Sequence, residues 1–148
     1  GSASRAGNLT MLPFPFLPQA RYDELLWFCD LNFVRGEDSF VRAQLAAKPL
    51  IWHIYPQDAD THQTKLEAFL ARYASDARVS PGGTASDKAV SAFTAFTAAW
   101  NGTGELDWLT LADHLPALTD EAEVWAAHLA ELPDLANNLA EFCRKKLK

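Results

Sequence analysis

The sequence has few cysteines and lacks any long apolar run. Its 148 residues include only two cysteines, Cys29 and Cys143, which lie far apart in stretches with apolar periodicity. We therefore expect two reduced, buried thiols in a cytosolic protein, rather than a disulfide or a metal site. No run of about 18 apolar residues occurs, so no transmembrane helix is predicted. The chain also shows no signal-peptide pattern.

Basic residues are fewer than acidic ones. The chain has 13 basic and 19 acidic residues, which gives a net charge of -6 at pH 7. A nucleic-acid backbone is therefore disfavoured as the main partner, because neutralising phosphates requires a basic face. The basic residues gather only at the C-terminus, at 144–148, where cations also complement a helix dipole.

Several motifs that would indicate a particular chemistry are missing. The sequence contains no GxGxxG, no Walker P-loop, no GxSxG elbow and no His/Cys cluster with zinc spacing, so we predict neither a metal nor a cofactor. His53 and His62 flank one predicted loop, where a metal-ligand or general-base role is conceivable. Strand alternation points His53 away from Trp52, and we interpret His53 as a packed strand histidine.

What is present is the composition of one globular domain, with 49% hydrophobic and 22% charged residues. The chain begins Gly1-Ser2 without an initiator Met, which is typical of the scar left when an expression tag is removed. We therefore expect residues 1–8 to be a tag scar and flexible start, and the natural protein to extend further N-terminal.

The central pattern is a strand, a helix and a second strand. An apolar run at 31–34 is followed by Arg35-Gly36 and by a helical pattern that ends at Pro49, and a second apolar run occupies 50–54. Two apolar runs separated by one helix predict a right-handed crossover between parallel strands. Ligands of such sheets bind at the carboxyl ends of the strands.

The same unit occurs on both sides of this pattern. A short strand at 9–14 with a helix after Gln19, and a helix at 60–74, complete three βα units, so the βα region is predicted to span 9–80. Beyond a turn-rich break at 80–84, a C-terminal helical region of the same domain spans 81–148. We predict its helices at 85–100, 107–115, 120–132 and 135–147, with Trp100, Trp108 and Trp125 in the core. Three parallel strands are few for a doubly wound sheet, which suggests the C-terminal portion of a larger enzyme.

The turn at 35–39 is the first candidate site. A helix N-terminus with the Ser39 hydroxyl is suited to a phosphate, and Arg35 adds a guanidinium that can hold a diphosphate. Glu37 and Asp38 would repel phosphate, so one could cap the helix while the other binds hydroxyl groups. A plain capping box around Asp38, with Arg35 in a surface ion pair, explains the turn equally well.

Two further strand-end loops carry aromatic and amide groups. Tyr55 could stack on a base or donate to a phosphate, although a core tyrosine is equally easy to explain. The Pro-rich loop supplies Phe14, Phe16 and Gln19, and aromatic stacking with one amide is typical of a nucleobase pocket. The joint placement of polar loops at three strand ends indicates a site for an anionic ligand.

The segment 12–74 contains RGEDSFVRAQ, then KP, then WHIYPQ. It resembles the EarP family, the protein-arginine rhamnosyltransferases that modify translation elongation factor P in some bacteria. The resemblance implies an α/β fold, the Rossmann-like C-terminal half of a GT-B glycosyltransferase, with few parallel strands followed by a helical tail. It also implies that 9–80 is a nucleotide-sugar-binding region, and that dTDP-β-L-rhamnose is the donor. Rhamnose would pass with inversion to an arginine of elongation factor P, without a cofactor.

The resemblance also implies roles for single residues. The general base is attributed to aspartates of an N-terminal domain that this chain does not contain, so we expect the chain alone to be inactive. Glu37 would orient the donor or the acceptor guanidinium as the catalytic residue. The donor would be held at its diphosphate end by Arg35, Asp38, Ser39 and Tyr55, and at its thymine by Phe16 and Gln19.

Two other classes of function stay open. The chain could be a protein-interaction module that binds no nucleotide, with the helical tail contacting a partner and the acidic surface favouring a basic one. It could also be an inert fragment of a larger enzyme.

Overall fold

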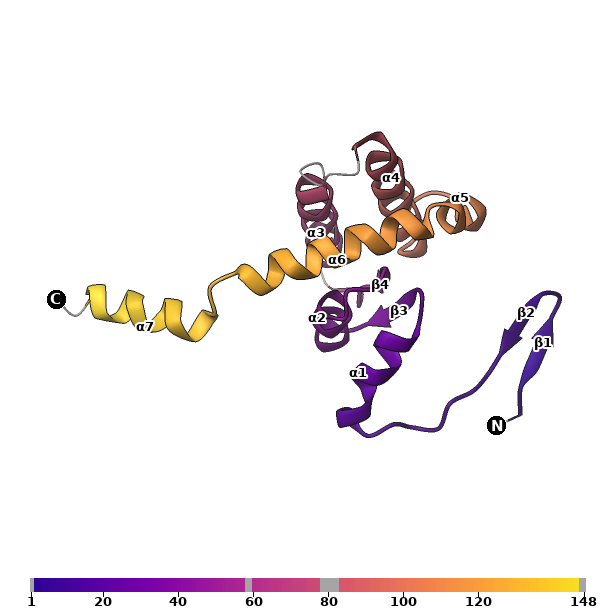
Figure 1. The fold of residues 1–148 in the computed structure, drawn as a ribbon, viewed down its shortest axis with the longest axis horizontal. Coiled ribbons are helices and arrows are strands. Elements are labelled where there is room, and N and C mark those ends of the chain that lie inside the picture. Colours follow the sequence, from indigo (N-terminus) through magenta and orange to yellow (C-terminus); the bar gives the residue numbers. More distant parts are fainter. Residues whose placement is uncertain (1, 58–59, 78–82, 147–148) are drawn as a thin grey trace.

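The computed structural model describes residues 2–57, 60–77 and 83–146, and it is a mixed α/β fold in which helices predominate (Figure 1). Its centre is a pair of parallel strands, β3 (Asn32–Arg35) and β4 (Leu50–His53), joined through α2 (Glu37–Leu45). The register places Asn32 opposite Leu50 and Arg35 opposite His53. The predicted parallel pairing around one helix is therefore confirmed.

The prediction of a third parallel strand at 9–14 is wrong. Residues Leu9–Met11 form β2, which pairs antiparallel with β1 (Ser4–Ala6), and Figure 1 shows this hairpin away from the β3–β4 pair. Gly7-Asn8 closes the hairpin with Gly7 at φ 61°, the backbone conformation that a two-residue turn requires. Within residues 1–8, which were expected to form a flexible start, Ser4–Ala6 are assigned to β1. All residues of both strands are exposed, so hairpin pairing rather than burial of an apolar face accounts for them.

The helices follow the predicted order. α1 covers Gln19–Phe28, and the later helices are α3 (Thr61–Ala77), α4 (Gly83–Trp100), α5 (Trp108–Asp113), α6 (Leu115–Glu131) and α7 (Leu135–Lys146). The predicted helix at 120–132 begins earlier because Pro116 is tolerated in the first turn, where a helix needs no N–H donor. Residues 80–82 of the predicted break lie outside the described residues, while Gly83 and Thr84 belong to α4.

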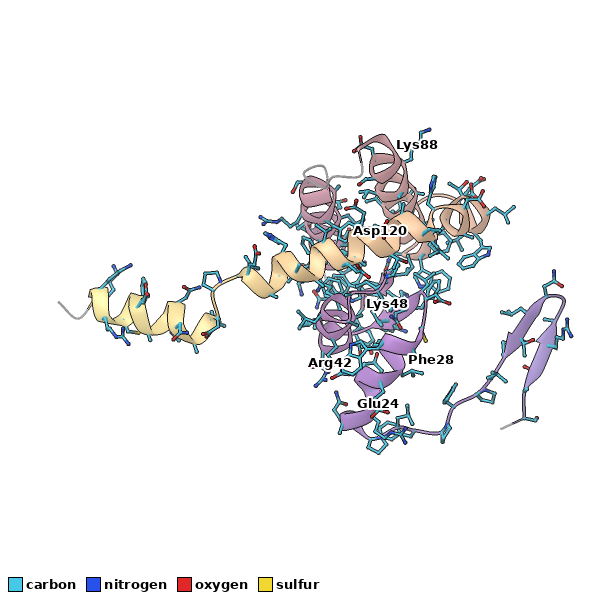
Figure 2. The ribbon with its side chains drawn as sticks, viewed as in Figure 1. Glu24, Phe28, Arg42, Lys48, Lys88 and Asp120 are labelled. Atoms are coloured by element: carbon cyan, nitrogen blue, oxygen red, sulfur yellow. The ribbon has the colours of Figure 1, made fainter. Side chains whose placement is uncertain are left out.

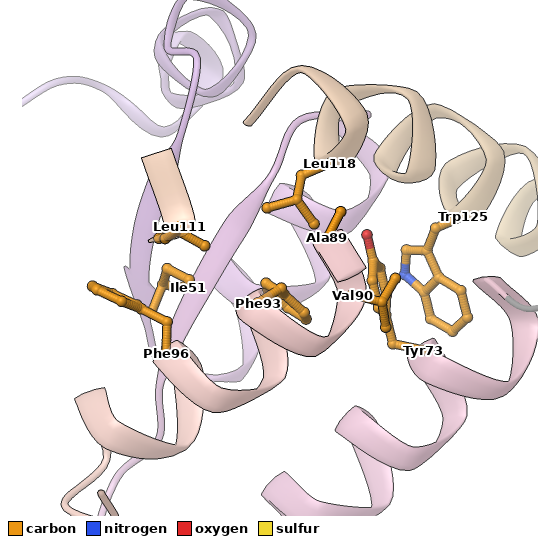
Figure 3. Packing of buried hydrophobic residues seen from close by; sticks show 9 residues of the cluster. All are labelled: Ile51, Tyr73, Ala89, Val90, Phe93, Phe96, Leu111, Leu118 and Trp125. Atoms are coloured by element: carbon orange, nitrogen blue, oxygen red, sulfur yellow. The ribbon is translucent and has the colours of Figure 1, made fainter. Parts of the chain in front are cut away.

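β4 is buried on both of its faces, as its unbroken apolar run suggested. Ile51 belongs to one core cluster with side chains from α3, α4, α5 and α6 (Figure 3). Leu50 and Trp52 belong to a second cluster with side chains from α1, β3, α2 and α3. The strand therefore connects the βα region to the helical region.

Some expectations about single side chains are wrong. Trp125 is buried as predicted, but Trp100 and Trp108 are 39% and 49% exposed. Trp100 ends α4 and packs on Phe33 with the two ring centroids 4.8 Å apart, at the outer edge of β3. Both cysteines are free thiols; Cys29 is half-buried, whereas Cys143 is exposed because α7 buries none of its residues.

α7 extends away from the rest of the molecule (Figure 1). Figure 2 shows side chains crowded between the helices of the main body, while those of α7 project freely. Among the helices that the structure describes, none has the length and apolar character needed to cross a membrane.

Candidate functional site

The turn between β3 and α2 is built around Gly36. Gly36 is the N-cap of α2 at φ 83°, a conformation that side-chain-bearing residues rarely adopt, and a Cβ there would lie 3.3 Å from Cε2 of Tyr55. No side chain caps this helix, so the alternative of a capping box around Asp38 is wrong. The first-turn amides of Glu37, Asp38 and Ser39 have no intrahelical acceptors and lie at the positive end of the helix dipole.

Arg35 and Tyr55 bring the two strand ends together. The Cζ atom of Arg35 lies 4.4 Å from the centroid of the Tyr55 ring, within cation–π distance, and both side chains are exposed. Arg35 forms no ion pair with a carboxylate in the described part of the chain, unlike the surface pairing considered as an alternative. Its guanidinium donors therefore stay available beside the start of α2.

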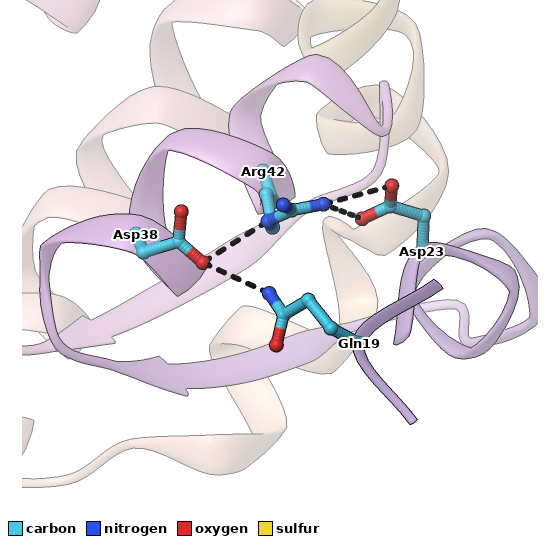
Figure 4. Close-up of polar contacts among 4 residues, drawn as sticks. All are labelled: Gln19, Asp23, Asp38 and Arg42. Atoms are coloured by element: carbon cyan, nitrogen blue, oxygen red, sulfur yellow. Dashed lines mark hydrogen bonds and ion pairs between the residues drawn. The ribbon is translucent and has the colours of Figure 1, made fainter. Parts of the chain in front are cut away.

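Asp38 is held by two donors. Its Oδ2 accepts from Nε2 of Gln19 at 3.2 Å and from Nε of Arg42 at 3.0 Å, and Nη1 of Arg42 donates to both carboxylate oxygens of Asp23 at 3.0 Å (Figure 4). These bonds raise the pKa of Arg42, with Asp23 the larger cause and Asp38 the next. Exposed pairs of this kind contribute little to overall stability. Their effect is to fix the start of α1 against the start of α2.

A groove opens between the Pro-rich loop and the start of α2, with a volume of about 320 Å³. The Phe16 ring at its rim is 98% exposed, so it can be covered by a planar ligand. One wall carries Asp38 and Ser39 from the first turn of α2, and the rest is mostly apolar. The lining residues are Phe14, Pro15, Phe16, Leu17, Gln19, Tyr22, Leu25, Asp38 and Ser39.

The structure sorts the predicted site residues into two groups. Phe16, Gln19, Asp38 and Ser39 meet at the groove, and Arg35 meets Tyr55 beside the same turn. Glu37 is exposed in the turn and belongs to neither group. All seven predicted residues therefore lie around the N-terminal end of α2, where the β3 and β4 loops emerge.

Sequence reasoning missed four residues of this region. Asp23 and Arg42 complete the charged contacts, and Tyr22 and Leu25 line the groove. The spacing of Asp38 and Arg42, four residues apart on a helix, was a detectable signal. The Asp23–Arg42 pair joins two helices, and no local pattern reports such a contact.

The site is thus an apolar groove that continues into a helix N-terminus at the carboxyl ends of two parallel strands. This arrangement is typical of α/β domains that bind phosphorylated ligands. The family model described as Elongation-Factor P (EF-P) rhamnosyltransferase EarP matches residues 1–144. The chain belongs to the EarP family.

Known proteins agree with this assignment. The chain is 44% identical over 149 residues to the protein-arginine rhamnosyltransferase of Pseudomonas putida, covering 99% of this chain and 37% of that protein. It is 49% identical over 130 residues to the Pseudomonas aeruginosa enzyme of the same name, covering 86% of this chain and 32% of that protein. The chain therefore spans about a third of the length of these curated relatives.

A solved structure also matches. It comes from work on the structural basis for EarP-mediated arginine glycosylation of translation elongation factor EF-P. The match has a TM-score of 0.77 at 41% sequence identity and covers 98% of this chain and 44% of that one. The described fold is therefore shared with a family member of known structure.

Proposed function

We propose that this chain is the donor-binding portion of an inverting glycosyltransferase that rhamnosylates an arginine of translation elongation factor P, with dTDP-β-L-rhamnose as the donor. The observation that carries the proposal is the groove at the start of α2, where Phe16, Gln19, Asp38 and Ser39 meet. An aromatic surface, an amide and a helix N-terminus in one groove suit a base joined to a diphosphate. The names of the relatives support this choice of reaction and acceptor.

The diphosphate lies against the first turn of α2 in this proposal. The free amides of that turn and the Ser39 hydroxyl donate to its oxygens, and Arg35 adds a charged donor. The ring of Tyr55 orients Arg35 through the cation–π contact and touches the diphosphate from the β4 loop. Arg42 offsets the charge of Asp38, which therefore repels the diphosphate less than an unpaired carboxylate would.

The thymine lies in the apolar part of the groove. Phe16 covers one face of the ring, and its present exposure is what a stacking platform requires. Gln19 faces the edge of the base and gives it a hydrogen-bond partner. No metal or cofactor takes part in this binding scheme.

Glu37 is the catalytic residue of the proposal. Its exposed carboxylate stands in the turn that holds the diphosphate, where it can orient the donor or the acceptor guanidinium. In the transfer, a guanidino nitrogen bonds to the anomeric carbon, the bond to dTDP breaks, and the released proton passes to a base. That base belongs to an N-terminal domain of a GT-B parent, so this chain alone binds the donor without transferring rhamnose.

Calorimetric titration of dTDP and dTDP-rhamnose tests donor binding. Arg35→Ala should weaken both by roughly 10- to 100-fold, the effect of losing a hydrogen bond from a charged donor. Arg21→Ala removes the same charge from α1, where Arg21 pairs only with Glu24 among the described residues, and should leave both affinities unchanged. Absence of dTDP binding by the wild-type chain, or equal affinity of Arg35→Ala, would contradict the proposal.

Glu37→Gln separates binding from transfer. The variant should keep its affinity for dTDP-rhamnose, because the first-turn amides and Arg35 are unchanged. In the full-length parent the same substitution should abolish rhamnosylation of elongation factor P, measured by the mass of the acceptor. Equal losses of binding and transfer would show that Glu37 is a donor ligand instead.

An interaction module is the second candidate function, and the bare surface of α7 favours it. Leu135, Leu139 and Phe142 are 81%, 58% and 58% exposed along one helix. If this surface binds the acceptor protein, the chain should capture elongation factor P without any nucleotide, and Leu139→Asp should prevent capture. Capture that is absent, or that requires dTDP, leaves donor binding as the function.

A further inference from the structure

Arg42 lies behind the groove rather than in it. It stands one turn after Asp38 on α2 and is not among the groove residues. Its guanidinium spans the gap between α1 and α2, with 3.0 Å bonds to Asp23 on one side and Asp38 on the other. Arg42 therefore does not contact a ligand in the groove, and it can act on the base through the residues it holds.

These residues form a chain of contacts with a regular spacing. Gln19 and Asp23 lie four residues apart on α1, and Asp38 and Arg42 lie four residues apart on α2, so each pair shares one helix face. Gln19 donates to Asp38, and Arg42 donates to Asp38 and Asp23, which joins the two faces (Figure 4). Substitution of Arg42 therefore changes how Asp38 is held, and Asp38 in turn contacts the Gln19 amide.

The contacts fix the orientation of the Gln19 amide. An ionised carboxylate accepts hydrogen bonds and donates none, so Asp38 must face the NH2 group of Gln19. Nε2 occupies that position at 3.2 Å from Oδ2, and Figure 4 shows the amide oxygen turned away from Asp38. That oxygen makes no hydrogen bond to the residues the structure describes. Gln19 therefore offers the groove an acceptor.

An acceptor that faces the N3 position of a bound base discriminates between pyrimidines. Thymine and uracil carry a donor at N3, whereas the N3 atom of cytosine is itself an acceptor and would face the Gln19 oxygen without a proton between them. The side chain of Asp38 is 72% exposed. If Arg42 were removed, Gln19 would be the one described partner left to orient the Asp38 carboxylate. The amide would then be free to turn and offer either group.

We propose that Arg42 is a positioning residue for base selection: anchored by Asp23, it holds Asp38 so that the Gln19 amide presents its oxygen to a pyrimidine with an N3–H donor. The inference rests on the proposed function, because it assigns these contacts to the nucleotide end of the same groove. It adds Arg42 and Asp23, which touch no ligand, to the residues that decide which nucleoside diphosphate binds.

The test compares dTDP with dCDP by calorimetric titration of the whole chain. The wild-type protein should prefer dTDP, and Arg42→Met should reduce the dTDP-to-dCDP affinity ratio by roughly threefold to tenfold, the effect of one neutral hydrogen bond. Gln19→Ala should reduce the ratio equally, and the double variant should lose no more, because both changes act on one contact. Arg42→Lys should restore part of the ratio, since an ammonium can reach Asp38 but does not form the two-sided bridge.

Arg21→Met is the matched control. It removes one α1 cation and inserts the same side chain, but in the described part of the chain Arg21 bonds only to Glu24 and to the backbone of Pro18, so the ratio should not change. If Arg42→Met does not fold, Asp23→Asn takes its place, because it weakens the anchor of Arg42 and preserves side-chain shape; it should also lower the ratio.

The outcomes separate the inference from the proposed function. Wild-type binding of dTDP with an unchanged ratio in Arg42→Met or Asp23→Asn would overturn the inference and leave donor binding intact. Equal wild-type affinities for dTDP and dCDP would also overturn the inference and leave donor binding intact. A wild-type chain that binds neither nucleotide would overturn the proposed function, and the inference with it.

Discussion

The two ends of α2 differ in how they are held. At its N-terminal end Glu37 and Asp38 are exposed, and Asp38 forms a surface ion pair with Arg42 one turn later on the helix. At its C-terminal end Gln44 is buried and accepts a hydrogen bond from Nε1 of Trp125 on α6 at 3.0 Å. The helical region therefore holds the C-terminal end of α2, while Glu37 and Asp38 at the start of the helix stay exposed. The residues proposed to bind the donor and the residue that anchors the helix in the core are thus different residues of one short helix.

The largest expected difference in stability is between two phenylalanine-to-alanine substitutions, one in the core of the helical region and one at the groove. Phe93 is 2% exposed in the core of the helical region, so Phe93→Ala should lower the free energy of unfolding by about 3–5 kcal/mol. Phe16 is 98% exposed, so Phe16→Ala should change it by less than about 0.5 kcal/mol. Urea denaturation measures both.

Calorimetry with dTDP completes this pair of variants. Phe16→Ala should weaken binding because it removes the stacking surface, although it leaves stability unchanged. Similar stability losses in Phe93→Ala and Phe16→Ala would show that the Pro-rich loop is part of the core. Unchanged dTDP affinity in Phe16→Ala would remove its role at the base.

A second pair of variants concerns the turn itself. Gly36→Ala places a residue with a Cβ at φ 83°, which should destabilise the protein by about 1–3 kcal/mol, and it also presses on Tyr55. Gly102 has φ 98°, and a Cβ added there would meet nothing within 4 Å, so Gly102→Ala should give a similar loss from strain alone. Thermal unfolding and dTDP titration together measure the two effects.

Only Gly36→Ala should weaken dTDP binding, because only there does the added atom displace the Tyr55 ring from Arg35. Equal dTDP affinities in the two variants would mean that the close approach of Tyr55 to the turn plays no part in the site.

The smallest expected effect lies in the helical region, at the N-cap of α5. Asp107 accepts hydrogen bonds from the hydroxyl and, with a smaller effect, from the backbone N–H of Thr110, and these hold the pKa of its carboxyl below the ordinary value of 3.8. Because the folded pKa is the lower one, the stabilisation is present above the unfolded pKa and is lost as pH falls through the folded pKa.

Asp107→Asn isolates this charge, because Asn is an equally good cap. The wild type should have the higher Tm at neutral pH, and the difference should disappear in acid, below the ordinary range of an aspartate. A difference that does not vary with pH would refute the assignment. Binding of dTDP should be the same in both proteins, since α5 contributes nothing to the groove.

The parallel pair and most helices could be predicted because their signals are local. The apolar runs at 31–34 and 50–54 and the helix between them can be recognised from hydrophobic periodicity and from helix start and stop residues. The hairpin was missed because residues 9–14 were interpreted as a strand of the parallel sheet, although Gly7-Asn8 is a turn signal. The exposure of Trp100 depends on what packs beside β3, which spacing along one helix does not report.

The candidate site was predicted in part for the same reason. The turn at 35–39 and Tyr55 follow apolar runs directly, so their place at strand ends could be foreseen. Gly36 as the N-cap could not be distinguished from an Asp38 cap, because both fit the local sequence. Asp23 and Arg42 meet only when α1 packs on α2, so a contact across 19 residues had no signature in the sequence.

The central claim is that the ligand binds at the open end of α2 while the helical region serves as its support. The most direct measurement is a titration of the isotopically labelled chain with dTDP, followed by amide proton–nitrogen correlation spectra. Amide signals of Gln19, Glu37, Asp38, Ser39 and Tyr55 should shift in proportion to dTDP, while those of α6, from Leu115 to Glu131, should stay in place. Shifts confined to α6 or α7, or no shifts at all, would contradict the account.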